Sequence, residues 1–170
     1  CVACEAAMKG IYKYLHTDDF DSEVEKQWGI TGLLHDIDYE LAQKENKLSK
    51  HGILIFEKDS NIIPEPIAHA IKSHNFQNTK VDPVTDMDWA ITCVDQLTGI
   101  IVACVLIHKD KKLSSIDAKF VLKRFHTPSF AKGASRIGIK LCEEKLGIPL
   151  EKFIEITLSS MQGISKALGL

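Results

Sequence analysis

The stretch that decides the fold is residues 85–108, TDMDWAITCVDQLTGIIVACVLIH. Thr85 is a helix-capping residue, and the apolar run from Trp89 to Ile107 predicts one long buried helix. The run is long enough to cross a bilayer, but Asp95 and Gln96 lie in its interior. An ionised carboxylate at that depth argues for the core of a soluble protein instead of a membrane span. We therefore expect a central helix that carries a carboxylate among apolar neighbours.

The sequence on both sides of this stretch also predicts helices. Apolar residues recur at spacings of three and four, and Ser, Thr, Pro and Gly stand where helices start or stop. No alternating run typical of a strand occurs, and no internal repeat. We expect an all-α bundle of about eight helices: Val2–Leu15, Ser22–His35 with Ser22 as its cap, Lys50–Lys58 after Ser49, Pro64–Asn75, Thr85–His108, Ile116–Phe125 after Ser114 or Ser115, Phe130–Leu146 after Ser129, and a last helix from Pro149.

Two glycines lie inside the second predicted helix, Gly29 and Gly32. Each costs about 1 kcal/mol of helix stability relative to Ala. We therefore expect a neighbouring backbone to approach the helix closely at these positions.

Length and charge bound the possible classes of function. The 170 residues include 21 Lys and Arg against 23 Asp and Glu, for a net charge of −2, and 45% are hydrophobic. This composition is typical of one soluble domain over residues 1–170 that buries a full core without disulfides. It does not indicate the strongly basic face of a general nucleic-acid or membrane-surface binder, but it is compatible with a pocket for a single anionic ligand.

The five cysteines form an odd and widely spread set, which fits a reducing, cytoplasmic location. The chain begins at Cys1 without a Met, so we expect residues upstream of it. No charged leader precedes an apolar stretch, so we expect no secretory signal in these residues. Cys1 and Cys4 have the spacing of a redox or zinc pair. No second pair follows at zinc-finger spacing, and no strand and turn of a thioredoxin-like site precede them, which argues against both roles.

Two places interrupt the apolar pattern with charge: the His35-Asp36 pair after GITGLL, and Asp95 after WAITCV. A carboxylate in such surroundings loses several kcal/mol of hydration unless a partner compensates it. A divalent cation shared by His35, Asp36 and Asp95 would do so, since imidazole and carboxylate are ordinary ligands of Mn²⁺, Fe²⁺, Co²⁺ and Zn²⁺. The alternative is an Asp95 that caps a helix or pairs with a Lys, and a His35 that is an ordinary core histidine.

Adjacent His and Asp side chains point about 100° apart on a helix, so both reach one ion only where the helix ends. The polar stretch after Asp36 indicates such an end. His51 in the first turn of a predicted helix and His74 at the end of another are candidate further ligands, with a surface or packing role as the alternative for each. We interpret the remaining histidines as ordinary ones: His16, His69, His108 and His126.

Four segments stand in a fixed order along the chain: Trp28–Glu40 (WGITGLLHDIDYE), His51, Ile71–Asn75 (IKSHN) and Val94–Ala103 (VDQLTGIIVA). In this order they resemble the HD superfamily of metal-dependent phosphohydrolases, and more closely a group of predicted HD hydrolases of unknown substrate. The resemblance extends over nearly the whole chain, through Lys111–Leu113, Phe130–Ala131, Arg136 and Leu146–Leu150. It implies an HD-domain-like helical bundle.

The resemblance also implies roles for individual residues. His35, Asp36 and Asp95 match the ligands of one metal, while His51 and His74 complete a second metal site or hydrogen-bond the phosphate. The implied catalytic carboxylates are Asp36, as a ligand, and Asp38, which is expected to orient a ligand histidine. Cations for the substrate phosphate are expected among Lys112, Lys132 and Arg136, with a solvated charged surface as the alternative for each.

The sequence departs from the superfamily pattern at two points. Members carry a first His ligand ahead of the His-Asp pair, and in the resembled group it falls immediately before the position of Cys1. We therefore expect a His directly before Cys1 in the full protein. Some members carry a Lys shortly after the His-Asp pair, and residues 37–40 (IDYE) provide none.

The resemblance predicts an enzyme that hydrolyses a phosphate ester, such as a nucleotide, with one or two ions of Mn, Fe, Co, Ni, Mg or Zn. Its partner is a small phosphorylated substrate, with no general nucleic-acid binding and no membrane, and the oligomeric state stays open. The alternatives are a non-catalytic sensor that binds a metal and a nucleotide, and a helical interaction module with a vestigial HD site.

Overall fold

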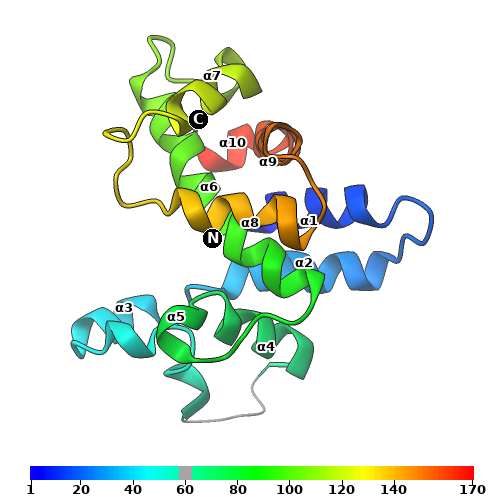
Figure 1. The fold of residues 1–170 in the computed structure, drawn as a ribbon, viewed down its shortest axis with the longest axis vertical. Coiled ribbons are helices and arrows are strands. Elements are labelled where there is room, and N and C mark those ends of the chain that lie inside the picture. Colours follow the sequence, from blue (N-terminus) through cyan, green and yellow to red (C-terminus); the bar gives the residue numbers. More distant parts are fainter. Residues whose placement is uncertain (58–62) are drawn as a thin grey trace.

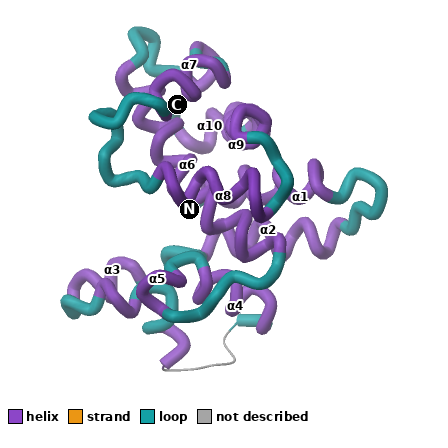
Figure 2. Tube along the Cα trace, viewed as in Figure 1, coloured by secondary structure: helices purple, strands orange, loops and turns teal. Residues whose placement is uncertain are grey.

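The computed structural model describes residues 1–57 and 63–170, and every regular element in this part of the chain is a helix (Figures 1 and 2). This confirms the predicted all-α class. The α-helices are α1 (Val2–Leu15), α2 (Ser22–Leu34), α3 (Tyr39–Lys44), α4 (Glu65–Ser73), α5 (Phe76–Thr79), α6 (Asp86–Ile107), α7 (Ala118–Phe125), α8 (Arg136–Lys145), α9 (Leu150–Gly163) and α10 (Ser165–Leu168). Three short 3-10 helices join them: η1 (Leu48–Lys50), η2 (Ile55–Glu57) and η3 (Leu113–Ser115).

The central helix α6 organises the other elements. Thr85 and Asp88 form a capping box, in which each side chain accepts a hydrogen bond from the backbone N–H of the other residue. The helix runs through the middle of the molecule and packs against α1, α8 and α9, while α3, α4 and α5 gather at the end where α6 begins (Figure 1). The core is built on this scaffold.

Among the described residues, α6 alone is long and apolar enough to span a membrane by length and composition. However, 61% of its most apolar window is buried inside the fold. α6 is therefore largely buried inside the fold, as expected from the carboxylate of Asp95 in its interior.

The contact between α1 and α2 depends on one glycine. A Cβ atom added to Gly32 would lie 2.5 Å from the carbonyl oxygen of Cys4 and 2.6 Å from its carbonyl carbon. This confirms the close backbone approach predicted at Gly32. At Gly29 the prediction is wrong, because an added Cβ would meet the flexible side chain of Lys9 instead of a backbone.

The predicted bounds agree with the structure for α1 and differ by one or two residues for α4, α6 and the start of α9. The cap of α2 differs. Its N-cap is Asp21, whose carboxylate accepts hydrogen bonds from the backbone N–H groups of Glu23 and Val24. The prediction of Ser22 as the cap is therefore wrong.

The prediction of a helix over Lys50–Lys58 is also wrong. The residues that the structure describes in this range belong to the end of η1, a turn and η2. The carboxylate of Asp38 accepts hydrogen bonds from the backbone N–H groups of Gly52 (2.9 Å) and Ile55 (3.3 Å). Gly52 has a φ of +93°, which an α-helix does not allow. A buried carboxylate from outside the segment thus takes two of the backbone donors that a continuous helix would use, and Lys58 lies outside the described residues.

α7 begins at Ala118 and not at Ile116, because Asp117 caps it by accepting a hydrogen bond from the backbone N–H of Phe120. Neither Ser114 nor Ser115 is its cap. Both lie in η3.

α8 begins at Arg136 after Ser135, and not at Phe130 after Ser129. Ala131 has a φ of +44°, which interrupts any helix at that point. The guanidinium of Arg136 donates hydrogen bonds to the backbone carbonyls of this irregular segment, which holds it in place.

The short helices α3 and α5 were not predicted. Polar residues dominate both, so neither carries the apolar spacing that marks a helix in sequence.

Candidate metal centre

Five of the predicted site residues meet where the ends of α2 and α4 face the middle of α6. His35 and Asp36 follow the last turn of α2, His51 follows η1, His74 follows α4, and Asp95 lies within α6. We call these five residues the His–Asp centre. The end of α2 gives His35 and Asp36 the change of backbone direction that allows both side chains to face the same space.

The imidazole of His35 joins the two carboxylates of the His–Asp centre. Its Nε2 lies 3.2 Å from an oxygen of Asp36 and 3.3 Å from an oxygen of Asp95. His35 is only 1% exposed. The structure therefore brings together His35, Asp36 and Asp95, although Asp95 lies 60 residues away along the chain.

The second part of the His–Asp centre is built around the other oxygen of Asp36. This oxygen lies 3.0 Å from Nε2 of His51, and Nε2 of His51 lies 3.1 Å from Nε2 of His74. Ligand atoms of Asp36, His51 and His74 all lie within 4.8 Å of one another, which is close enough for one ion to bind all three. Asp36 thus lies between the two parts and faces both.

All three imidazoles are held from behind through Nδ1. The Nδ1 atom of His35 contacts the carbonyl oxygen of Gly32 (2.9 Å), that of His51 a carboxylate oxygen of Asp38 (2.7 Å), and that of His74 the carbonyl oxygen of Ile71. A carbonyl or carboxylate oxygen only accepts, so each Nδ1 carries the proton that it donates. Each Nε2 is consequently the atom that faces the His–Asp centre, as in metal sites whose ligand histidines are fixed by a hydrogen bond on the far nitrogen.

Asp38 lies behind the His–Asp centre. It is 1% exposed and accepts hydrogen bonds from His51 Nδ1 and from the backbone N–H groups of Gly52 and Ile55. Burial alone would raise the pKa of its carboxyl group, but these donors outweigh burial and lower it. Asp38 therefore stays ionised and fixes the ring of His51, which is the orienting position that the sequence predicted for it.

The three histidines differ in charge. Burial opposes protonation of His35 and of His51, but the neighbouring carboxylates outweigh burial and raise the pKa of His35 to about 11 and that of His51 to about 9. Burial lowers the pKa of His74 to about 4, helped by the positive charge of His35. In the metal-free protein, two protonated rings and one neutral ring therefore surround the carboxylates at pH 7.

The carboxylates of the His–Asp centre stay ionised. Burial would raise the pKa of Asp36 and that of Asp95, but hydrogen bonds from His35 lower both, and His51 lowers that of Asp36 further. Protons on His35 and His51 thus occupy the positions between imidazole nitrogen and carboxylate oxygen that a divalent cation would take. The donor set of imidazole and carboxylate fits such an ion.

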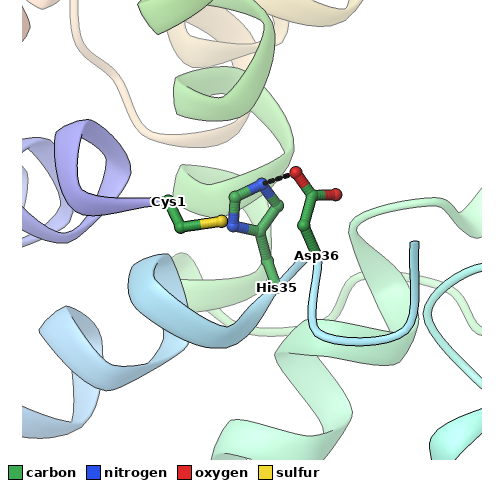
Figure 3. A group of neighbouring side chains, drawn as sticks. All are labelled: Cys1, His35 and Asp36. Atoms are coloured by element: carbon green, nitrogen blue, oxygen red, sulfur yellow. Dashed lines mark ion pairs between the residues drawn. The ribbon is translucent and has the colours of Figure 1, made fainter. Parts of the chain in front are cut away.

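Two cysteine thiols also reach the His–Asp centre. Ligand atoms of Cys4, His35 and Asp95 lie within 4.8 Å of one another, and so do those of Cys1, His35 and Asp36 (Figure 3). Both cysteines come from the start of α1, which the close approach at Gly32 holds against α2. The spacing of Cys1 and Cys4 was noted in the sequence, but it gave no connection to His35. Their neighbours in the structure are His and Asp side chains and not a second pair of cysteines.

A pocket of about 370 Å³ adjoins the His–Asp centre at His74. Its lining residues are all uncharged at pH 7, His74 included, and the others are Asn75, Phe76, Gln77, Thr92, Gln96, Ser135, Ile137, Gly138 and Leu141. Gln96 connects the pocket to the centre, because its amide donates to Asp95 (2.7 Å) and accepts from the backbone N–H of Ser135 (3.0 Å). The sequence placed Gln96 beside Asp95 but assigned it no role.

The structure does not bring the three predicted phosphate-binding cations to this pocket. Lys112 and Lys132 are exposed and are not among its lining residues. Arg136 gives its guanidinium to the carbonyls of Phe125, Ala131 and Ala134 and of Phe130. The assignment of Arg136 to substrate phosphate is therefore corrected, because the cation holds the segment before α8.

Comparison of the chain with models of known protein families, with curated proteins and with solved structures gave no match. The interpretation of the His–Asp centre therefore rests on its own geometry.

Proposed function

We propose that this protein is a divalent-metal-dependent phosphohydrolase of the HD type that acts on a small phosphate ester. The observation that carries the proposal is the orientation of His35, His51 and His74. All three donate through Nδ1 to fixed acceptors, which leaves Nε2 to face the centre: that of His35 lies beside Asp36 and Asp95, that of His51 beside Asp36, and that of His74 beside Nε2 of His51. Imidazole nitrogens that give up their Nε2 protons, together with two ionised carboxylates, are a donor set that a divalent cation takes.

Two neighbouring groups of ligands support a centre for two ions. Asp36, His51 and His74, whose ligand atoms all lie within 4.8 Å of one another, would hold one ion, and His35 with Asp95 would hold a second, with the other oxygen of Asp36 beside His35. Bound divalent ions supply a nucleophile by lowering the pKa of water and polarise a phosphoryl oxygen. Asp38 keeps the ring of His51 in position, and the burial of His35 excludes bulk solvent from the inner side of the centre.

The pocket beside His74 is the proposed place for the rest of the substrate. Its neutral lining of amides, hydroxyls and Phe76 suits a group that hydrogen-bonds and stacks without carrying charge, such as a nucleobase. Gln96 holds Asp95 and the backbone of Ser135 together, so it keeps the pocket aligned with the His–Asp centre. A nucleotide therefore fits the arrangement better than a polyphosphate, which would need cations in the pocket.

The test is hydrolysis of generic phosphoesters and of a panel of nucleotides with added Mn²⁺. We expect the wild-type protein to release phosphate and Asp95→Asn to lose the activity by roughly two orders of magnitude or more, because the substitution removes a charged ligand without changing the shape of the side chain. Asp110→Asn is the control, since Asp110 is exposed and lies outside the centre.

Three outcomes would count against a hydrolase or in favour of another function. Equal activity of wild-type protein and Asp95→Asn would defeat the assignment. Tight binding of an intact nucleotide together with metal, without turnover, would favour a sensor. Less than one equivalent of bound metal in the full-length protein would favour an interaction module with a vestigial site.

A further inference from the structure

The cysteine pair Cys1-Val-Ala-Cys4 lies directly against the His–Asp centre. Cys1 is the N-cap residue of α1, and Cys4 lies in its first turn. Cys4 forms a group of close ligand atoms with His35 and Asp95, and Cys1 forms another with His35 and Asp36 (Figure 3). His35 is common to both groups, so two thiols approach the same imidazole.

Neither thiol has a role in the proposed hydrolysis. Cys4 is 3% exposed and has one weak polar contact, with the hydroxyl of Thr98 at 3.4 Å, and Cys1 is exposed and free. The other three cysteines are buried in the apolar core. The pair at the start of α1 is therefore the only one that the described residues bring to the His–Asp centre.

The chemistry of these ligands differs from that of the His–Asp centre alone. Thiolates favour soft ions such as Zn²⁺ and Cd²⁺, whereas imidazole and carboxylate without sulfur also suit Mn²⁺. Four protein ligands from Cys, His and Asp are typical of closed tetrahedral zinc sites, which leave no position for water or substrate. Catalytic sites keep one position open.

We propose that Cys4, His35 and Asp95, whose ligand atoms lie within 4.8 Å of one another, form a site for a thiophilic divalent cation such as Zn²⁺ or Cd²⁺, and that Cys1, which reaches the same imidazole in its own group with Asp36, adds the second thiolate as the ion binds. Each thiol, and the imidazolium of His35 at Nε2, releases its proton to solvent as its sulfur or nitrogen binds the ion. Occupation of this site removes His35 and Asp95 from the ion used in hydrolysis and stops the reaction, while Asp36, His51 and His74 keep their own group. The binding of the cation is independent of the proposed function. Only its effect on hydrolysis rests on the proposed function.

The test uses Co²⁺ as a coloured substitute for Zn²⁺ in the full-length, reduced protein. A thiolate ligand gives a sulfur-to-cobalt charge-transfer band in the near ultraviolet, which imidazole and carboxylate ligands do not give. We expect this band in the wild-type protein, about half of it in Cys1→Ser or Cys4→Ser, and none in the double variant. Cys104→Ala is the matched control, since it removes a buried thiol far from the His–Asp centre and should leave the band unchanged.

A competition experiment gives a second measure. Equilibrium dialysis with Zn²⁺ and Mn²⁺ together should show that the preference for Zn²⁺ falls about tenfold or more in each cysteine variant. Circular dichroism checks that the variants are folded. If Cys4→Ser fails to fold, Cys1→Ser decides, because Cys1 is exposed and its replacement disturbs no packing.

The outcomes separate this proposal from the proposed function. A wild-type cobalt complex without a sulfur band overturns the thiolate site and leaves the hydrolase intact. A sulfur band in a protein that hydrolyses no phosphoester with Mn²⁺ supports the thiolate site and overturns the hydrolase. Inhibition by Zn²⁺ that is equally strong in the double cysteine variant contradicts the regulatory consequence.

Discussion

Asp38 is the residue at which a single-atom change tests the His–Asp centre without touching a proposed ligand. In Asp38→Asn, one oxygen becomes an NH₂ group, so the side chain no longer accepts from His51 and from both backbone donors together. The ring of His51 loses its fixed orientation. We expect the affinity for Mn²⁺, measured by calorimetry, to fall about 10–100-fold.

Asp88 provides a matched control for Asp38. Both carboxylates are 1% exposed, both accept from two backbone N–H groups, and both contact a histidine, which for Asp88 is His69 at 3.0 Å. Asp88→Asn should therefore lower stability to a similar extent and leave the affinity for Mn²⁺ unchanged. An equal loss of affinity in both variants would show that Asp38 acts through general stability alone.

At the residue scale, the sequence predicted which His and Asp residues gather at the centre better than it predicted the positions of the Lys and Arg side chains. His35, Asp36 and Asp95 stood out because charge inside an apolar run requires a partner. Arg136 carried no such signal. Its role depends on the carbonyls that the left-handed Ala131 turns toward it, and no local pattern in the sequence reports that geometry.

Gly32 shows how one element fixes the position of another. A methyl group at this position would overlap the Cys4 backbone, so Gly32→Ala has to move α1 away from α2. Overpacking of this kind costs about 1–3 kcal/mol, which exceeds the gain of about 1 kcal/mol in helix propensity. We expect a net loss in the free energy of unfolding, measured with urea.

Replacement of Gly29 by Ala should change the free energy of unfolding in the opposite direction. There the added methyl group meets only the end of the Lys9 side chain, which can move into solvent, so the gain in helix propensity remains. Gly29→Ala is expected to be neutral or to stabilise the protein by up to about 1 kcal/mol. Destabilisation of equal size by both variants would contradict the proposed role of the Cys4 backbone.

At the scale of elements, the long helices were predictable and the segments between them were not. The apolar pattern of α6 lies within the helix and its cap, Thr85, directly precedes it, so neighbouring residues in the sequence are enough to predict the helix. The residues from Leu48 to Glu57 have an equally helical pattern, but the carboxylate of Asp38 accepts from the backbone N–H groups of Gly52 and Ile55. That contact is tertiary, and the sequence alone does not reveal it.

At the scale of the whole molecule, the centre joins three helices that the unfolded chain does not hold together. Its ligands come from the ends of α2 and α4, the turn after η1 and the middle of α6. Mn²⁺ at a hundred times its dissociation constant should therefore add about 2.7 kcal/mol of stability. For a chain of this length that raises the thermal midpoint by roughly 5–10 °C, and EDTA should reverse it. No shift in wild-type protein, or an equal shift in Asp95→Asn, would contradict a metal site here.

The size of this stabilisation should depend on pH through His35 and His51. Their pKa values are raised to about 11 and about 9, above the ordinary 6.5, so protonation stabilises the metal-free fold fully below pH 6.5. This contribution is lost as the pH rises through about 9 and then about 11. The cation that binds through His35 and the cation that binds through His51 each displace one proton, so the affinity of both groups rises with pH over the same range. His74, whose pKa is lowered to about 4, contributes no proton at neutral pH.

The shift in thermal midpoint caused by Mn²⁺ should consequently grow from pH 6.5 to pH 9, while the metal-free protein becomes less stable. Calorimetry at pH 7.5 in buffers of different ionisation enthalpy should count about two protons released when both groups of the centre are filled, and about one in His51→Gln. The replacement removes one titrating ring and leaves His35 in place. A shift that is the same at both pH values, with no proton release, would show that the cation binds elsewhere and that the charges of the His–Asp centre belong to folding alone.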